Sequence, residues 1–422
     1  MQTFTAWQYL LIDAANQFGL DKQMFEERIH WTLINLNQLE KIAEDRGWWK
    51  ERPLYVKATQ AIRKAQKGIP TGHLVGFDAV CSGVQIMSAL TGCHAGGSST
   101  GLVDTGSRPD AYTSVTYAMN EILEEQGLSV HISRDEAKRA TMTSYYGSKK
   151  TPKNIFGEGT PQLDAFYKAS STVAPGAWSL LGDLLGSWNA GALYHAWKLP
   201  DGYDARVKVM EKIENTPQNR VEVDELDHMT FTYVWYENRG TKQGLSNIAN
   251  VVHSIDAYIL RCVHRRCNYD EEMIDELSLL IEEALLSKII GNDDEGLDID
   301  GQVSYYVEQY KRSGMADVVV LPFLDSLSVY CLTKEHLQKL SAIITGMKQY
   351  KPFHVVTVHD EFKCLAGNMN WLRWQYKEIL AEISESKLLD DILSQLYHMP
   401  VKFQKMGTDI GIEIRNSNYA LC

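Results

Sequence analysis

The sequence has no long apolar run and no paired-cysteine motif, and these absences narrow the class of protein. No stretch of about eighteen uncharged apolar residues occurs, since the nearest, residues 169–197, is interrupted by Asp183, Asn189 and several glycines. None of the seven cysteines forms a CxxC pair or a zinc spacing, so we expect reduced thiols. The first residues, MQTFTAWQYLLIDA, lack the basic start of a secretory signal. These features favour a cytoplasmic protein that does not contact a membrane.

The negative charge is concentrated in one segment. Of the formal net charge of −12, residues 270–300 contribute −11, with twelve acidic residues against the single base Lys288. The rest of the chain is close to neutral, and residues 134–153 hold six basic residues against two acidic ones. The acidic excess therefore does not exclude a polyanionic ligand elsewhere on the molecule.

Length, composition and periodicity predict a folded chain of helices and strands. The 422 residues correspond to about three domain-sized units, and 44% hydrophobic with 23% charged residues is the ordinary globular balance. Apolar spacing and turn residues predict helices at 26–67 (with a break at Trp48–Trp49), 110–125, 134–146, 173–197 and 253–264, and strands at 74–80, 229–236, 354–358 and 361–365. The acidic segment 270–300 is expected to be a helix followed by a loop.

Asp78 lies at the end of the apolar strand in GFDAVCSGVQ. A carboxylate in such surroundings is costly unless it is paired or bound to a cation. An aspartate at a strand-to-helix turn can simply cap the helix. An acidic residue at a strand end is also a usual way to present an oxygen ligand to Mg²⁺.

The expected helix RDEAKRATMTSYYG begins with a capping box, because Ser133 stands three residues before Glu136. Arg134, Lys138, Met142 and Tyr146 recur every four residues and share one broad face. Two cations, an apolar surface and a phenol suit an extended nucleotide, with the triphosphate near the cations. A solvated basic helix with its Met and Tyr packed inward would show the same pattern.

In VHDEF, two hydrophobic strands flank His359, Asp360 and Glu361, so the acidic residues lie at a hairpin tip. A polar turn explains this pattern, and a zinc site lacks a second histidine at a suitable spacing. Asp360 together with Asp78 makes a better site. Two carboxylates from separate strands can hold two Mg²⁺ ions for in-line phosphoryl displacement.

The order and spacing of these three segments resemble motifs A, B and C of the single-subunit RNA polymerases of phages and mitochondria, which are related to family A DNA polymerases. Further blocks agree. DAVCSGVQ resembles the family's DGSCSGIQ, TMTSYYGSK resembles VMTLAYGSK, LPDGY resembles TPDGF, and NVVHSIDAYILR resembles NFVHSQDGSHLR. The resemblance extends from about residue 25 to the end, apart from an extra segment near 268–345.

The resemblance implies an α+β, right-hand polymerase fold with an antiparallel palm sheet and helical fingers, in which the thumb and the N-terminal domain are missing. The implied divisions are an N-terminal segment contacting a partner (1–24), palm with motif A (25–115), fingers with motif B (116–244), palm with motif C and the C-terminal tail (245–267 and 346–422), and an acidic insertion (268–345).

The resemblance also implies roles for individual residues. Asp78 and Asp360 would hold the two Mg²⁺ ions, with the Ala79 carbonyl as a further ligand. Arg134 and Lys138 would bind the triphosphate, and Lys138 would donate a proton to the departing diphosphate.

Around the nucleoside, Met142 would contact the base, Tyr146 with Gly147 would seat the pair near the ribose, and His253 would help to read the 2′-hydroxyl. His359 would steady the primer end.

The implied function is that of a DNA-directed RNA polymerase, a nucleotidyltransferase that adds ribonucleoside triphosphates to an RNA transcript on a DNA template. Because the missing parts must come from elsewhere, we expect a second polymerase subunit in a heterodimer. The chain resembles the large subunit of the split RNA polymerase of N-four-like podoviruses, which implies the cytoplasm of an infected bacterium. Accessory factors for promoter opening are further candidate partners.

Two alternatives stay open. Glu361 replaces the serine expected in RNA enzymes, and VHDE is the form of family A DNA polymerases, so a DNA polymerase fragment is one alternative. Against it, no glutamate follows Asp78 at residues 80–83 to exclude the 2′-hydroxyl. Ala79 and Ile86 also depart from the family's usual glycine and histidine. A non-catalytic scaffold subunit is the other alternative.

Overall fold

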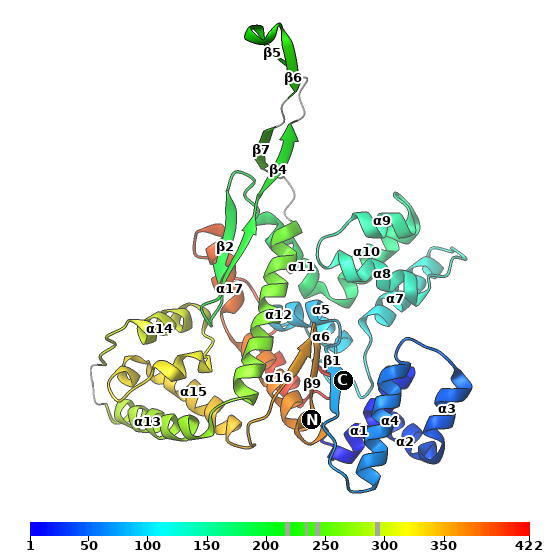
Figure 1. The fold of residues 1–422 in the computed structure, drawn as a ribbon, viewed down its shortest axis with the longest axis vertical. Helices are drawn as coiled ribbons and strands as arrows, with labels where there is room; N and C mark the ends of the chain where they lie inside the picture. The colour runs from blue at the N-terminus through cyan, green and yellow to red at the C-terminus, as the bar shows by residue number, and fades with distance from the viewer. Residues whose placement is uncertain (216–219, 233–234, 241–244, 292–295) are drawn as a thin grey trace.

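The chain folds around a small antiparallel sheet, which lies near the centre of Figure 1. In this computed structural model, β1 (Leu74–Asp78) pairs with β9 (Glu361–Leu365), which also pairs with β8 (Val356–Val358). The register places Asp78 opposite Glu361. The structure describes residues 1–215, 220–232, 235–240, 245–291 and 296–422.

The largest core of the molecule lies beside this sheet. Inward side chains of the paired strands, Phe77 and Phe362, are almost fully buried, as alternation along a half-exposed strand requires. Helices complete the core, chiefly α5 (Ser82–Thr91), α11 (Pro175–Gly186), α12 (Leu245–Cys267), α16 (Met369–Glu385), α17 (Leu388–Tyr397) and α18 (Ile410–Asn416), and α6 (His94–Ser99) packs against α5 and α11.

The N-terminal part is helical, with α1 (Ala6–Ala15), α2 (Phe25–Ile34), α3 (Leu39–Arg46) and α4 (Arg52–Gln66). The helices at 26–67 and their break are as predicted. Contact of the segment 1–24 with a partner stays a prediction, and residues 9–15 of α1 are buried in the main core of this chain. That stretch is therefore a structural part of the core, because its apolar residues pack on β1 and α4 rather than facing outward.

A helical lobe with its own core comprises α7 (Ala111–Glu125), α8 (Arg134–Ser144), α9 (Lys150–Phe156) and α10 (Pro161–Val173). The predicted capping box of α8 is confirmed, since Ser133 and Glu136 exchange side-chain and backbone hydrogen bonds. The helix ends two residues earlier than expected. The chain then turns through Gly147, whose φ of +87° is readily adopted only by glycine.

Three antiparallel strand pairs form a long projection, which rises to the top of Figure 1. They are β2 (Tyr194–Lys198) with β3 (Asp204–Lys208), β4 (Met210–Asn215) with β7 (Trp235–Gly240), and β5 (Arg220–Val223) with β6 (Met229–Thr232). The prediction of helices throughout 173–197 is wrong at its end, because residues 194–198 pair with β3. The strand predicted at 229–236 corresponds to β6 and the start of β7, and residues 233–234 lie outside the described residues.

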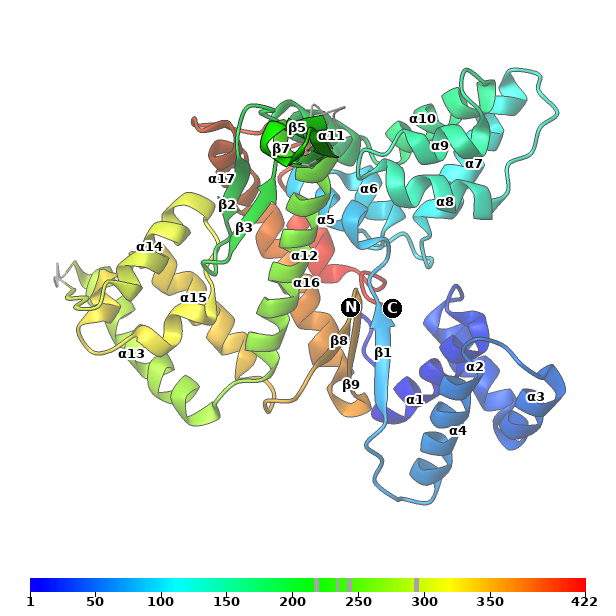
Figure 2. The same ribbon diagram turned by 45° about the horizontal axis from the view of Figure 1, so that its top comes forward.

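The acidic segment belongs to a separate helical module with its own core. It contains α13 (Glu271–Ile290), α14 (Gln302–Ser313) and α15 (Lys334–Met347), and it lies at the opposite side of the molecule from the α7–α10 lobe (Figure 2). The helix and following loop are as predicted, although residues 292–295 lie outside the described residues. Among the described residues, no helix is both long and apolar enough to cross a membrane.

Candidate active site

A cleft of about 850 Å³ lies between the N-terminal helices, the end of strand β1 and the α7–α10 lobe. Figure 2 shows β1 near the centre, with the N-terminal helices at the lower right and the α7–α10 lobe at the upper right. Six of the residues singled out from the sequence line this cleft: Asp78, Ala79, Lys138, Met142, Tyr146 and Asp360. Segments that are far apart in the sequence thus contribute to one cavity.

Asp78 and Asp360 are neighbours across two paired strands. Asp78 is the last residue of β1, and Asp360 lies in the two-residue turn directly before β9. The Ala79 N–H donates a hydrogen bond of 3.0 Å to the Asp360 carbonyl oxygen. On the other side, the Cys422 N–H donates to the Asp78 carbonyl at 3.0 Å. The backbone of Asp78 is therefore held from two sides while its carboxylate faces the cleft.

The electrostatics of the cleft favour a cation near Asp78. Restricted access to water, then the charges of Glu361 and Asp360, raise the pKa of Asp78 to about 6. Glu361 lies against Gly76, where an added Cβ would approach the Glu361 Oε1 to 2.2 Å. Glu361 also pairs with Lys363 at 2.8 Å. The glutamate at position 361 is therefore accommodated by Gly76 on the paired strand, which leaves room for its side chain, and by an ion pair with Lys363.

Arg134 and Lys138, the two cations of α8 that were predicted to bind a nucleotide, have different surroundings. Arg134 donates from Nε to the Asp110 Oδ2 at 2.7 Å, and this pairing outweighs burial and keeps the pKa of Asp110 below its usual value. Lys138 lies with its ammonium 5.7 Å from the centre of the Tyr112 ring. No carboxylate partner is found for Lys138 within the described part of the chain. Lys138 is thus the more available of the two cations.

Tyr146 connects α8 with the start of α5 and with α12. A Cβ added at Gly83 would lie 2.3 Å from the Tyr146 hydroxyl, so the phenol is packed directly against that glycine. The rings of Tyr146 and His253 are 5.2 Å apart between centroids. Burial raises the pKa of Tyr146, so the phenol stays protonated. Met142 is 52% exposed and offers an apolar surface to the cleft.

His359 occupies the tip of the β8–β9 turn, where it is exposed and has a φ of +56°. It does not line the cleft, although its neighbour Asp360 does. Arg134, Gly147 and His253 also do not line the cleft, but each adjoins a residue that does. Arg134 bonds to Asp110, the ring of His253 lies against Tyr146, and Gly147 follows Tyr146 in the chain.

Sequence reasoning missed two acidic residues of this region. Asp256 lies on α12 one helical turn after His253, and burial followed by the charge of Asp360 raises its pKa to about 6. Its spacing of three from His253 was a signal that it shares that face. Asp110, the N-cap of α7, stands at the start of the helix predicted at 110–125, but its pairing with Arg134 depends on tertiary packing.

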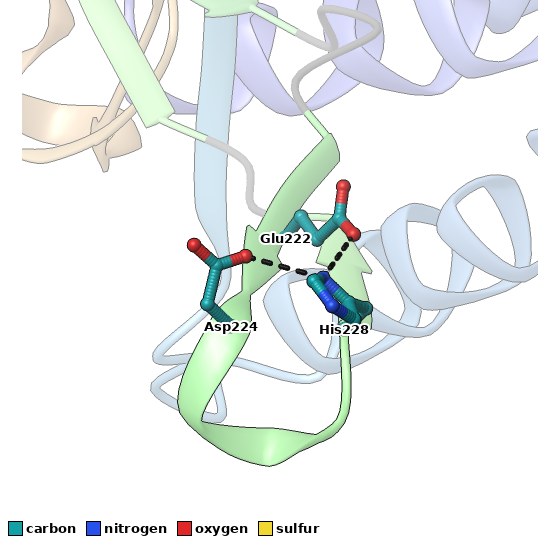
Figure 3. A group of neighbouring side chains, drawn as sticks. All are labelled: Glu222, Asp224 and His228. Atoms are coloured by element: carbon teal, nitrogen blue, oxygen red, sulfur yellow. Dashed lines mark ion pairs between the residues drawn. The ribbon is translucent and has the colours of Figure 1, made fainter.

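The donor set at the sheet end suits Mg²⁺. Asp78 and Asp360 offer hard oxygen ligands, and the pKa of Asp78 is raised by burial and then by the charges of Glu361 and Asp360, a repulsion that a cation would relieve. A different group, Glu222, Asp224 and His228 (Figure 3), lies around β5 and β6, which form the tip of the strand projection in Figure 1. The His228 Nδ1 is 2.8 Å from Glu222, and all three side chains are exposed, as solvated ion pairs are.

Comparisons with known proteins show that part of the chain is similar to RNA polymerases. Residues 3–155 match the family model described as DNA-dependent RNA polymerase. This range includes Asp78 and the whole of α8 but not His253, His359 or Asp360.

Over part of its length the chain is similar to DNA-directed RNA polymerases, in agreement with its motifs. It is 25% identical over 189 residues to the DNA-directed RNA polymerase of Enterobacteria phage T3 and 24% identical over 187 residues to T7 RNA polymerase of Escherichia phage T7. Each match covers 34% of this chain and 21% of the relative. A probable DNA-directed RNA polymerase of Neurospora crassa is 30% identical over 164 residues, 35% of this chain and 18% of that protein. The matches thus span about a fifth of these relatives.

Proposed function

We propose that this chain carries the nucleotide-addition site of a DNA-directed RNA polymerase and uses two Mg²⁺ ions. The observation that carries the proposal is that Asp78 and Asp360 lie beside each other at one end of a sheet, in the same cleft as Lys138 and Met142 of α8 and Tyr146, which follows that helix. In this proposal, the central sheet is the palm and the α7–α10 lobe is the fingers.

Asp78, Asp360 and the Ala79 carbonyl would hold the Mg²⁺ ions. When bound, these ions would supply charge that activates the 3′-hydroxyl of the RNA and neutralises the departing diphosphate. The chain contributes rigid placement, since hydrogen bonds on both sides fix the backbone of Asp78. The raised pKa of Asp78 means that metal binding and proton release are coupled at this carboxylate.

Lys138 would bind the triphosphate and donate a proton to the leaving diphosphate, because it is a cation of the cleft without a carboxylate partner among the described residues. Arg134 uses Nε and Nη2 on Asp110. Among the described residues its Nη1 has no hydrogen-bond acceptor, and it would meet a phosphate oxygen. Asp110 thereby orients Arg134 rather than cancelling its role.

The nucleoside would lie along the remainder of the α8 face. Met142 supports the base, and Tyr146 with Gly147 places the ribose. His253, whose ring adjoins Tyr146, would approach the 2′-hydroxyl. His359, exposed at the turn beside Asp360, would steady the primer end.

Replacement of Asp360 tests whether the chain is an enzyme. Asp360→Ala should abolish nucleotide addition while the fold is retained, and Asp135→Ala, which removes an exposed carboxylate on the outer side of α8, should leave addition intact. Equal activity of both variants would favour the scaffold alternative. Circular dichroism and thermal unfolding monitor the fold in each case.

The sugar choice distinguishes RNA from DNA synthesis. Residues 80–83 provide no acidic side chain, and the Tyr146 hydroxyl occupies the space beside Gly83. Primer extension with ribonucleotides should therefore exceed extension with deoxynucleotides, and Tyr146→Phe should relax this preference. A preference for deoxynucleotides would instead support the DNA polymerase alternative.

A second polymerase subunit would complete the enzyme on the DNA template, in the cytoplasm of an infected host. The outer edge of β8 is unpaired among the described residues, and Val356 and Val358 on it are 45% and 50% exposed. Such an apolar edge is normally covered. Purification from the native source should yield a stoichiometric smaller chain, and Val358→Lys should release it.

A further inference from the structure

The outward face of α13 carries an apolar line between two rows of carboxylates. Leu279, Leu286 and Ile290 are 69%, 59% and 65% exposed. At about 100° per residue, Leu286 and Ile290 lie within about 20° of Leu279, so the three form one line roughly 16 Å long. Exposed leucines at such regular spacing are not scattered surface residues.

Acidic residues border this line on both sides. Glu276 and Glu283 lie about 40–60° to one side of it, and Asp275 and Glu282 lie the same angle to the other. Asp275 pairs with Lys348, but no cation partner is found for Glu276 or Glu283 among the described residues. The surface therefore combines an apolar centre with a largely uncompensated negative border.

The apolar line is not an unsatisfied part of the module's own core. The opposite side of α13 supplies the core through Ile274, Leu277, Ile281 and Ala284, which are buried. α13 is thus apolar on two sides, whereas a helix that only covers a core is polar on its outer side. Figure 1 shows α13 at the outer margin of the molecule, away from the cleft.

We propose that this acidic-bordered face of α13 (Asp275, Glu276, Leu279, Glu282, Glu283, Leu286 and Ile290) binds a basic amphipathic helix of a partner protein. The leucines would pack against the apolar stripe of that helix, and the carboxylates would pair with lysines or arginines beside the stripe. A second copy of α13 fits poorly, because its own border is acidic and like charges would face each other. This surface lies outside the catalytic cleft, so the proposal does not depend on the proposed function.

The proposal can be tested with a synthetic helical peptide that has a leucine stripe bordered by lysines. Fluorescence anisotropy with the full chain should show binding that weakens as salt is raised. The double variant Leu279→Ser/Leu286→Ser should weaken binding at least tenfold, and Glu276→Gln/Glu283→Gln should weaken it severalfold with a shallower salt dependence. Leu33→Ser/Ile34→Ser, which removes exposed apolar residues from α2, is the matched control and should have no effect.

Three results would overturn the proposal. One is undiminished binding by the α13 variants, and another is equal binding of a peptide with the same leucines bordered by glutamates. The third is a dimer of the free chain in sedimentation experiments that Leu279→Ser/Leu286→Ser dissociates, because the face would then serve self-association. Each variant is first checked for an unchanged thermal unfolding transition.

Discussion

Replacement of Arg265 should destabilise the chain strongly, and more at high pH than at low pH. Arg265 lies on α12 between two buried acids from different parts of the molecule. Its Nη2 is 2.7 Å from the Asp317 carboxylate of the helical module, and its Nη1 is 3.3 Å from Asp201 in the β2–β3 turn. The side chains of Asp317 and Asp201 are only 4% and 3% exposed.

In Arg265→Met, Asp317 would keep the Val319 N–H as a donor but lose its cation. Removing one partner of a buried ion pair costs about 3–5 kcal/mol. For a chain of this length, 4 kcal/mol corresponds to a fall of about 4–5 °C in Tm. Arg261→Met is the matched control. It should cost about 1 kcal/mol or less, because Asp201 would still have Arg265.

The pH dependence identifies the cause. Burial alone raises the pKa of Asp317, but Arg265 outweighs burial and keeps that pKa below its usual value. Without Arg265, burial raises the pKa of Asp317 in the folded chain above its value in the unfolded chain. The ionised carboxylate then lowers the free energy of unfolding, and this loss is complete above the folded-state pKa. Urea unfolding should therefore show a larger loss at pH 8 than at pH 5. A loss below 1 kcal/mol, or one that does not change with pH, would refute the reasoning.

Three further predictions concern the cleft and its supporting helix. Gly83→Ala should reduce nucleotide addition and ribose selectivity, because the new Cβ would lie 2.3 Å from the Tyr146 hydroxyl and would push it aside. Single-nucleotide incorporation measures both properties, and unchanged selectivity would contradict the placement of Tyr146 beside the ribose. Lys138→Met should slow incorporation by about 100-fold or more without loss of stability, as expected for a general acid, and stopped-flow assays would reveal a smaller effect. Ser133→Ala should lower the free energy of unfolding by about 1 kcal/mol through loss of the α8 cap, and Ser171→Ala, on the exposed surface of α10, is the control.

The sequence was sufficient to predict the strands and helix that build the cleft. Apolar runs ending in an aspartate marked β1 and the hairpin before β9, and the capping box marked the first residue of α8. These signals are local, because strand ends and helix caps depend on residues within a few positions. The family motifs supplied what local signals lack, namely that Asp78 and Asp360 should meet.

Other features depend on contacts between distant segments and could not be read from the chain. The pairing of Arg134 with Asp110 and the packing of Glu361 on Gly76 are examples. Residues 194–198 were misassigned because tyrosine and tryptophan suit either a buried helix or a strand, and pairing with β3 decided the outcome. The burial of α1 also required knowledge of the surface that it covers.

In the sequence, the strand projection lies between two parts of the chain that pack against each other without its help. β1 precedes it and β9 follows it, yet these strands pair with each other, and α12 packs against α5. Proteolytic cleavage of the projection should therefore leave two fragments that remain associated through the shared core. The same geometry makes the projection a suitable point at which to express the protein as two complementary polypeptides, one contributing Asp78 and the other Asp360.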